Sequence, residues 1–203
     1  KPWRITADTA VDSLTHAIEA YVSSKAFEYT DAFALAAMPA IVENVRDACE
    51  NPENAEARKK LMLAASQAGM AFSNSSVALV HGMSRPIGAH FHIAHGLSNA
   101  MLLPKITEFS VQGNEERYAA CARVMKWAHD TDSNASACSK LVENLFILNE
   151  DLKVPSPKSL GHIADKKTLK LMASQALASG SPQNNPRVPT ENQIIKLYEE
   201  IWG

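Results

Sequence analysis

Apolar residues recur every three or four positions along most of the chain, which is the period of an amphipathic α-helix. The first helix is predicted to begin after a capping residue, Thr6 or Asp8. Its buried stripe consists of Val11, Leu14, Ile18 and Val22. Alternating β-branched runs, which are typical of half-buried strands, are nearly absent. The pattern therefore predicts an all-α protein, organised as one multi-helix domain over residues 1–203.

Further helices are expected wherever the same period returns between breaks rich in Pro, Gly, Asn or Ser. The expected ranges are 29–50, 54–72, 77–83, 97–103, 115–127, 135–148, 166–178 and 191–202. Pro39 is expected to kink the second helix. Pro86 with Gly88 is expected to end the helix over 77–83, and Pro104 the helix over 97–103, because proline removes a backbone donor.

Composition narrows the classes of function. The formal net charge is −2 and no block of like charges occurs, which argues against nucleic acid or an anionic membrane as a partner. The longest apolar run, residues 32–42, is too short to span a bilayer. Cys49, Cys121 and Cys138 are odd in number and far apart, a pattern typical of reduced thiols in a cytoplasmic protein.

Asp12 and His16 are the first candidates for chemistry. A separation of four residues places both side chains on one face of the predicted helix, where a carboxylate and an imidazole can bind the same ion. An ordinary contact on the helix surface explains the pair equally well when it is considered alone.

A second cluster favours a metal. His81, His90, His92 and His95 fall within fifteen positions of an otherwise apolar segment. His81 is expected near the end of one short helix and His95 at the start of the next, with a loop between them. Buried histidines need partners, and residues 73–76 are expected to supply those of the outer shell. His90 and His92 either line a pocket or face solvent.

One carboxylate and three imidazoles would suit Fe(II), Zn(II), Co, Ni or Mn. The segment from Asp12 to Tyr21 is similar to the motif D-A-L-T-H-A-x-E-A-Y. His81-Gly82-Met83, His95 to Ala100 and Leu102-Leu103-Pro104 resemble a second signature. Both motifs belong to the iron-containing (group III) alcohol dehydrogenases, and Asn185-Pro186-Arg187 with Leu197, Tyr198 and Trp202 resembles the usual ending of that family.

The resemblance implies the helical C-terminal domain of a two-domain enzyme, with Asp12, His16, His81 and His95 as ligands of Fe(II) or Zn(II). NAD or NADP would be bound by an N-terminal α/β domain that is absent here. The chain is accordingly expected to be a fragment, inactive alone, of a homo-oligomeric enzyme that acts on a small alcohol or aldehyde.

Two further positions follow from the resemblance. Phe72 falls where the family often places an aromatic side chain near the nicotinamide and the substrate. Arg85 stands where many members have a histidine, and a guanidinium cannot relay protons at neutral pH. We therefore expect Arg85 to bind an acidic substrate group or a cofactor phosphate.

Two alternatives remain at this point. The adjacent pair His129-Asp130 in a helical chain is compatible with an all-helical metal-dependent phosphohydrolase. A non-catalytic helical metal-binding domain is the other.

Overall fold

The chain folds into nine α-helices, and the expected all-α class is confirmed. The computed structural model describes residues 1–203 and contains no β-strand. The helices are α1 (Trp3–Val22), α2 (Glu28–Glu50), α3 (Ala55–Asn74), α4 (Leu79–Phe91), α5 (His95–Ser110), α6 (Glu115–Val124), α7 (Asn134–Asp151), α8 (Lys166–Ala178) and α9 (Glu191–Trp202). Short 3-10 turns follow α5, α7 and α8.

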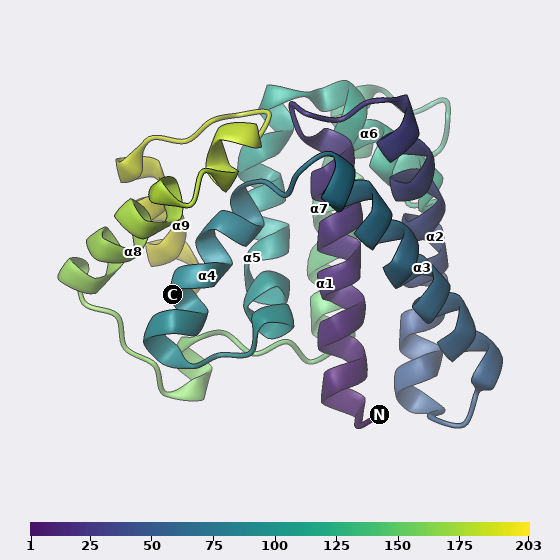
Figure 1. Cartoon of the computed structure of the whole chain (residues 1–203), viewed down its shortest axis with the longest axis horizontal. Helices are drawn as coiled ribbons and strands as arrows, with labels where there is room; N and C mark the ends of the chain where they lie inside the picture. The colour runs from purple at the N-terminus through teal and green to yellow at the C-terminus, as the bar shows by residue number, and fades with distance from the viewer.

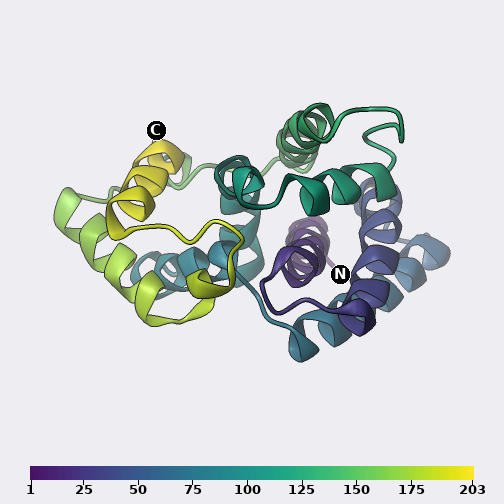
Figure 2. The same ribbon diagram turned by 90° about the horizontal axis from the view of Figure 1, so that it is seen from above.

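Helix α1 is central to the arrangement (Figure 1). α2 and α3 pack against it to form a three-helix unit, and α5 packs against another side of it. α4 pairs with α5 and contacts α8, which in turn packs on α9. Seen from above, the α1–α3 unit and the group of α4, α8 and α9 lie on opposite sides of α5 (Figure 2). Buried apolar side chains from all nine helices form a single continuous core.

Most expected helices occur with ends shifted by a few residues, but α4 and α5 extend well beyond their expected C-terminal ends. The predictions that Pro86 ends one helix and Pro104 another are wrong, because both prolines lie inside helices and both are buried. An internal proline costs about 3 kcal/mol. The fully buried neighbours Met83 and Ile87 on α4, with Leu102 on α5, offset this cost by removing apolar surface from water.

The start of α1 also differs from the prediction. The helix begins at Trp3, before both expected caps, and Pro2 precedes it without a side-chain cap. Asp8 instead accepts a hydrogen bond from Nε of Arg4 at 2.8 Å. None of the helices combines the length and the apolar character that crossing a bilayer requires.

The contact between α5 and α1 is unusually close at Gly96. A Cβ atom at this position would lie 2.6 Å from the backbone oxygen of Asp8 and 3.4 Å from Cβ of Asp12. Only glycine lets the two backbones approach this closely without displacing one of them. The neighbouring His95, the first residue of α5, is thereby held beside Asp12 on α1.

Candidate metal centre

One face of α1 carries three ionisable side chains in successive turns: Asp12, His16 and Glu19. Their spacing of four and three residues places them in a row along the helix. Glu19 is only 3% exposed, which requires that its carboxylate be fully hydrogen-bonded. This residue was not among the predicted site residues.

Glu19 receives its hydrogen bonds from the beginning of α4. The backbone N–H groups of Ala78 and Val80 donate to its two carboxylate oxygens at 2.9 and 2.6 Å, and that of His81 donates at 3.4 Å. The N-cap residue of α4 has no capping side chain of its own. Glu19 therefore caps a helix distant in sequence, and its negative charge is favourable at that helix N-terminus.

The same carboxylate orients His81, which is 3% exposed. Nδ1 of His81 lies 2.7 Å from Oε2 of Glu19, so the ring points its Nε2 away, toward Asp12. His81 sits in the first turn of α4 and not near its end as expected. The prediction that residues 73–76 supply the outer partner is wrong, because Glu19 does so.

Three donor atoms meet at one place. Oδ1 of Asp12 lies 3.6 Å from Nε2 of His81 and 3.7 Å from Nε2 of His95. Their ligand atoms all lie within 4.8 Å of one another, and no other three His, Cys, Asp or Glu side chains in the chain do so. The Asn99 amide also lies against them, with Nδ2 at 2.6 Å from Oδ1 of Asp12.

His16 lies next to this group, but its ring nitrogen is farther from Asp12 than those of His81 and His95. Its Nδ1 is 4.0 Å from Oδ2 of Asp12. The ring is stacked between two others, with its centroid 4.2 Å from that of Phe72 on α3 and 4.4 Å from that of His81. Phe72 thus contacts a predicted ligand directly and restricts how its ring can turn.

Charge and burial give the three imidazoles different protonation. Burial and the nearby charge of His81 lower the pKa of His16 to about 4. Burial also lowers the pKa of His95, as do the charges of His81 and Arg85. Burial opposes charge on His81 as well, but hydrogen bonds to Asp12 and Glu19 outweigh it and raise the pKa of His81 to about 9. At neutral pH, His16 and His95 are therefore neutral, while the metal-free His81 is protonated.

This pattern predicts a pH-dependent metal affinity. A metal ion must displace the proton of His81, so each pH unit below 9 should weaken the apparent affinity about tenfold. Calorimetric titration of Co(II) between pH 6 and 8 should show a fall of about a hundredfold toward the lower pH. An affinity that stays flat across this range would contradict the assignment.

The metal-free protein should show the opposite trend in stability. The pKa of His81 is raised in the folded state, to about 9 from a reference of 6.5. The stabilisation it contributes is therefore complete below pH 6.5 and lost as the pH rises through 9. Urea unfolding in the presence of a chelator measures this trend.

The remaining candidates lie around or away from the centre. Arg85 is exposed on α4, one turn after His81; its Nη1 donates to Oγ of Ser181 at 2.9 Å, and it makes no ion pair within 4 Å. His90 contacts Oε1 of Gln175 through Nε2 at 2.8 Å. His92 is exposed at the C-terminal end of α4. Neither belongs to the metal group.

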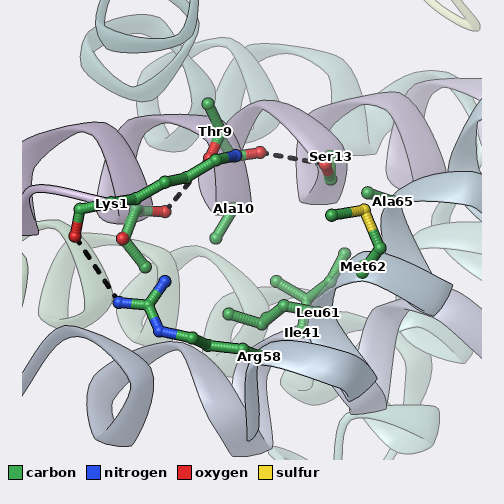
Figure 3. A pocket seen from close by; sticks show the side chains of 10 residues that line it. Lys1, Thr9, Ala10, Ser13, Ile41, Arg58, Leu61, Met62 and Ala65 are labelled. Atoms are coloured by element: carbon green, nitrogen blue, oxygen red, sulfur yellow. Dashed lines mark hydrogen bonds between the residues drawn. The ribbon is translucent and has the colours of Figure 1, made fainter. Parts of the chain in front are cut away.

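A separate hollow of about 310 Å³ lies between α1, α2 and α3 (Figure 3). Its floor is apolar, with Ile41 and Leu61, and Lys1 and Arg58 lie at one end, where a guanidinium nitrogen donates to the Lys1 backbone oxygen. None of the donor residues of the metal group lines it. The candidate centre therefore occupies a different face of α1.

Comparison with known proteins identifies the class. The model of the iron-containing alcohol dehydrogenase family, C-terminal part, matches residues 6–202. The chain therefore belongs to this family, as its motifs indicated.

Individual relatives support the same family assignment. The chain is 33% identical to 1,3-propanediol dehydrogenase of Citrobacter freundii over 100% of its own length and 52% of that protein. It is 35% identical to lactaldehyde reductase of Escherichia coli K12, with 99% and 52% covered. The solved alcohol dehydrogenase of Oenococcus oeni superimposes with a TM-score of 0.93 at 34% identity, with 99% and 52% covered. The chain spans about half the length of these relatives.

Proposed function

We propose that this chain is the metal-binding half of an NAD(P)-dependent alcohol dehydrogenase, in which Asp12, His16, His81 and His95 bind a catalytic Fe(II) or Zn(II). The observation that carries the proposal is the meeting of Asp12 Oδ1, His81 Nε2 and His95 Nε2 at one place. One carboxylate with neutral imidazoles is a donor set that suits these ions. The Glu19 carboxylate behind His81 is the usual partner of a metal-bound imidazole.

Each side chain has a distinct task in this proposal. The bound ion would supply a Lewis acid for the oxygen of a small alcohol or aldehyde during hydride exchange with nicotinamide. Glu19 fixes the His81 ring, and Phe72 fixes the His16 ring. The His95 side chain is 50% exposed, which makes it the open side of the centre where a substrate can approach. We assign the nicotinamide to a part of the enzyme outside these 203 residues.

The test is metal content combined with activity. The purified full-length enzyme should carry one divalent ion per chain and reduce NAD or NADP with a simple alcohol. The His95→Ala variant should lose both properties. The His129→Ala variant should keep both, whereas a phosphohydrolase that uses His129-Asp130 would lose its activity. Undiminished alcohol oxidation after complete removal of metal would contradict the proposal.

Arg85 is proposed to bind an anionic group at the rim of this centre, either a carboxylate of the substrate or a phosphate of the cofactor. It is exposed and free of any ion pair, and its charge reaches His95. Unpaired guanidinium groups bind such anions bidentately.

We expect Arg85→Gln to raise the KM for the anionic partner about tenfold to a hundredfold, since a hydrogen bond to a charged group contributes about 1.5–3 kcal/mol. Comparing a hydroxy acid with a neutral diol, and NADP with NAD, identifies which anion is bound. Unchanged KM values in all four assays, with unchanged metal content, would reduce Arg85 to an ordinary surface residue.

A further inference from the structure

The Asn99 side chain lies against the converging atoms of the candidate centre, although neither its position in the sequence nor its residue type marks it as a metal ligand. It is on α5, one turn after His95, and it is 0% exposed. The close approach of α5 to α1 at Gly96 directs this turn of the helix toward Asp12. The Asn99 side chain consequently ends between α1, α4 and α5.

A single atom of Asn99 contacts all three converging donors. Its Nδ2 lies 2.6 Å from Oδ1 of Asp12, 3.1 Å from Nε2 of His95 and 3.2 Å from Nε2 of His81. These are the same three atoms that a metal ion would bind in the proposed centre. An amide nitrogen carries two hydrogens and no lone pair available for hydrogen bonding, so it can donate to two of these atoms, and its two shortest contacts are with Asp12 and His95.

The other end of the amide has no partner. Oδ1 of Asn99 is buried and accepts no hydrogen bond, a state that costs about 1–3 kcal/mol. Turning the amide over would place Oδ1 2.6 Å from a carboxylate oxygen, where two acceptors would repel each other. The observed orientation therefore favours hydrogen bonds to Asp12 and His95 and leaves the amide's own oxygen without a partner. Such an unsatisfied buried group calls for an explanation in function.

We propose that Asn99 is a positioning residue of the metal centre, whose amide gathers Asp12 and His95 before the ion binds and then holds Asp12. This inference rests on the metal site of the proposed function. In the metal-free protein, the two amide hydrogens bridge atoms from α1 and α5 that would otherwise separate. After an ion takes the imidazole lone pairs, the bond to Asp12 persists, because a carboxylate oxygen has a second lone pair.

The test compares two buried amides in the whole protein, with Co(II) alone as the probe. Asn99→Ala removes the bridging amide. Asn185→Ala is the matched control, because Asn185 is also buried and donates from Nδ2 at 2.9 Å to Oγ of Ser110, the last residue of α5, and it contacts none of the predicted ligands. Asn99→Leu, which keeps the branching at Cγ but removes both polar atoms, replaces Asn99→Ala if that variant does not fold. Calorimetry gives the Kd of Co(II), and the visible absorption spectrum reports its coordination.

We expect Asn99→Ala to raise the Kd of Co(II) about tenfold to a hundredfold, as substitutions behind metal ligands typically do, and to shift the visible bands of bound Co(II). Asn185→Ala should lower the unfolding midpoint in urea while leaving the Kd and the spectrum unchanged. Parent-like Kd and spectrum in the Asn99 variant would overturn the assignment of Asn99 alone. A parent protein that binds no Co(II) would overturn the metal centre itself, and with it the role of Asn99.

Discussion

Replacing Asp12 with Asn is expected to lower kcat/KM for alcohol oxidation about a thousandfold, because a catalytic ion supplies several kcal/mol of transition-state stabilisation. Asp12 is the only carboxylate among the four proposed ligands, and its Oδ1 is the atom closest to the other donors. The substitution keeps the shape of the side chain but removes its negative charge. Loss of that charge weakens binding of a divalent cation directly and removes one of the two anions that flank His81.

A matched control lies one turn earlier on the same helix. Asp8 is buried, but it pairs with Arg4 and is not part of the metal group. Asp8→Asn should therefore change the unfolding free energy while leaving metal content and kcat/KM close to those of the parent. Metal analysis and steady-state kinetics on both variants test whether Asp12 is a metal ligand. Parent-like rate and metal content in Asp12→Asn would remove Asp12 from the ligand set.

Local spacing was sufficient to place the first part of the site. Because four residues make slightly more than one helical turn, Asp12 and His16 had to lie on one side of α1. The position of His95 at the start of α5 was also predictable, and the family motifs linked it to His81. Asp12, His81 and His95 lie together in the structure, and their role as metal ligands stays a prediction.

The features that the sequence pattern did not predict, the extents of α4 and α5, depend on tertiary contacts. Pro86 and Pro104 were predicted to end helices. Both helices nevertheless continue past their proline, because the packing of α4 on α5 stabilises them. Since α4 extends to Phe91, most of the segment between His81 and His95 is helical, and only residues 92–94 lie outside the helices. The candidate site therefore lies on three packed helices, which restrict the positions of the predicted ligands more than a loop would.

The two missed partners share one physical cause. Glu19 was visible as part of the motif around Asp12, but its role depends on the α4 N-terminus, about sixty residues away in the chain. Asn99 repeats the four-residue spacing, from His95, that marked Asp12 and His16. Its contact with Asp12 depends on the approach of α5 to α1 at Gly96. Helical periodicity places residues on a face but does not say which helix that face meets.

Glu19→Ala is expected to reduce the free energy of unfolding of the metal-free protein by about 3–5 kcal/mol, the usual cost of removing one partner from a buried, hydrogen-bonded charge pair. The carboxylate is 3% exposed and accepts from three backbone N–H groups of the α4 N-terminus as well as contacting His81. Alanine would leave these donors buried without acceptors. It would also release the His81 ring, so metal affinity should fall about tenfold to a hundredfold.

The control is Asn54→Ala, which removes an ordinary local cap. The Asn54 side chain accepts from the N–H groups of Glu56 and Ala57 at the start of α3, at 3.1 and 3.0 Å. Loss of such a partly exposed cap costs about 1 kcal/mol. Equilibrium unfolding in urea at pH 7 with a chelator present compares the two variants, and Co(II) titration follows metal binding. If Glu19→Ala costs no more than Asn54→Ala, Glu19 does not hold α4 to α1, and the orientation of His81 must have another source.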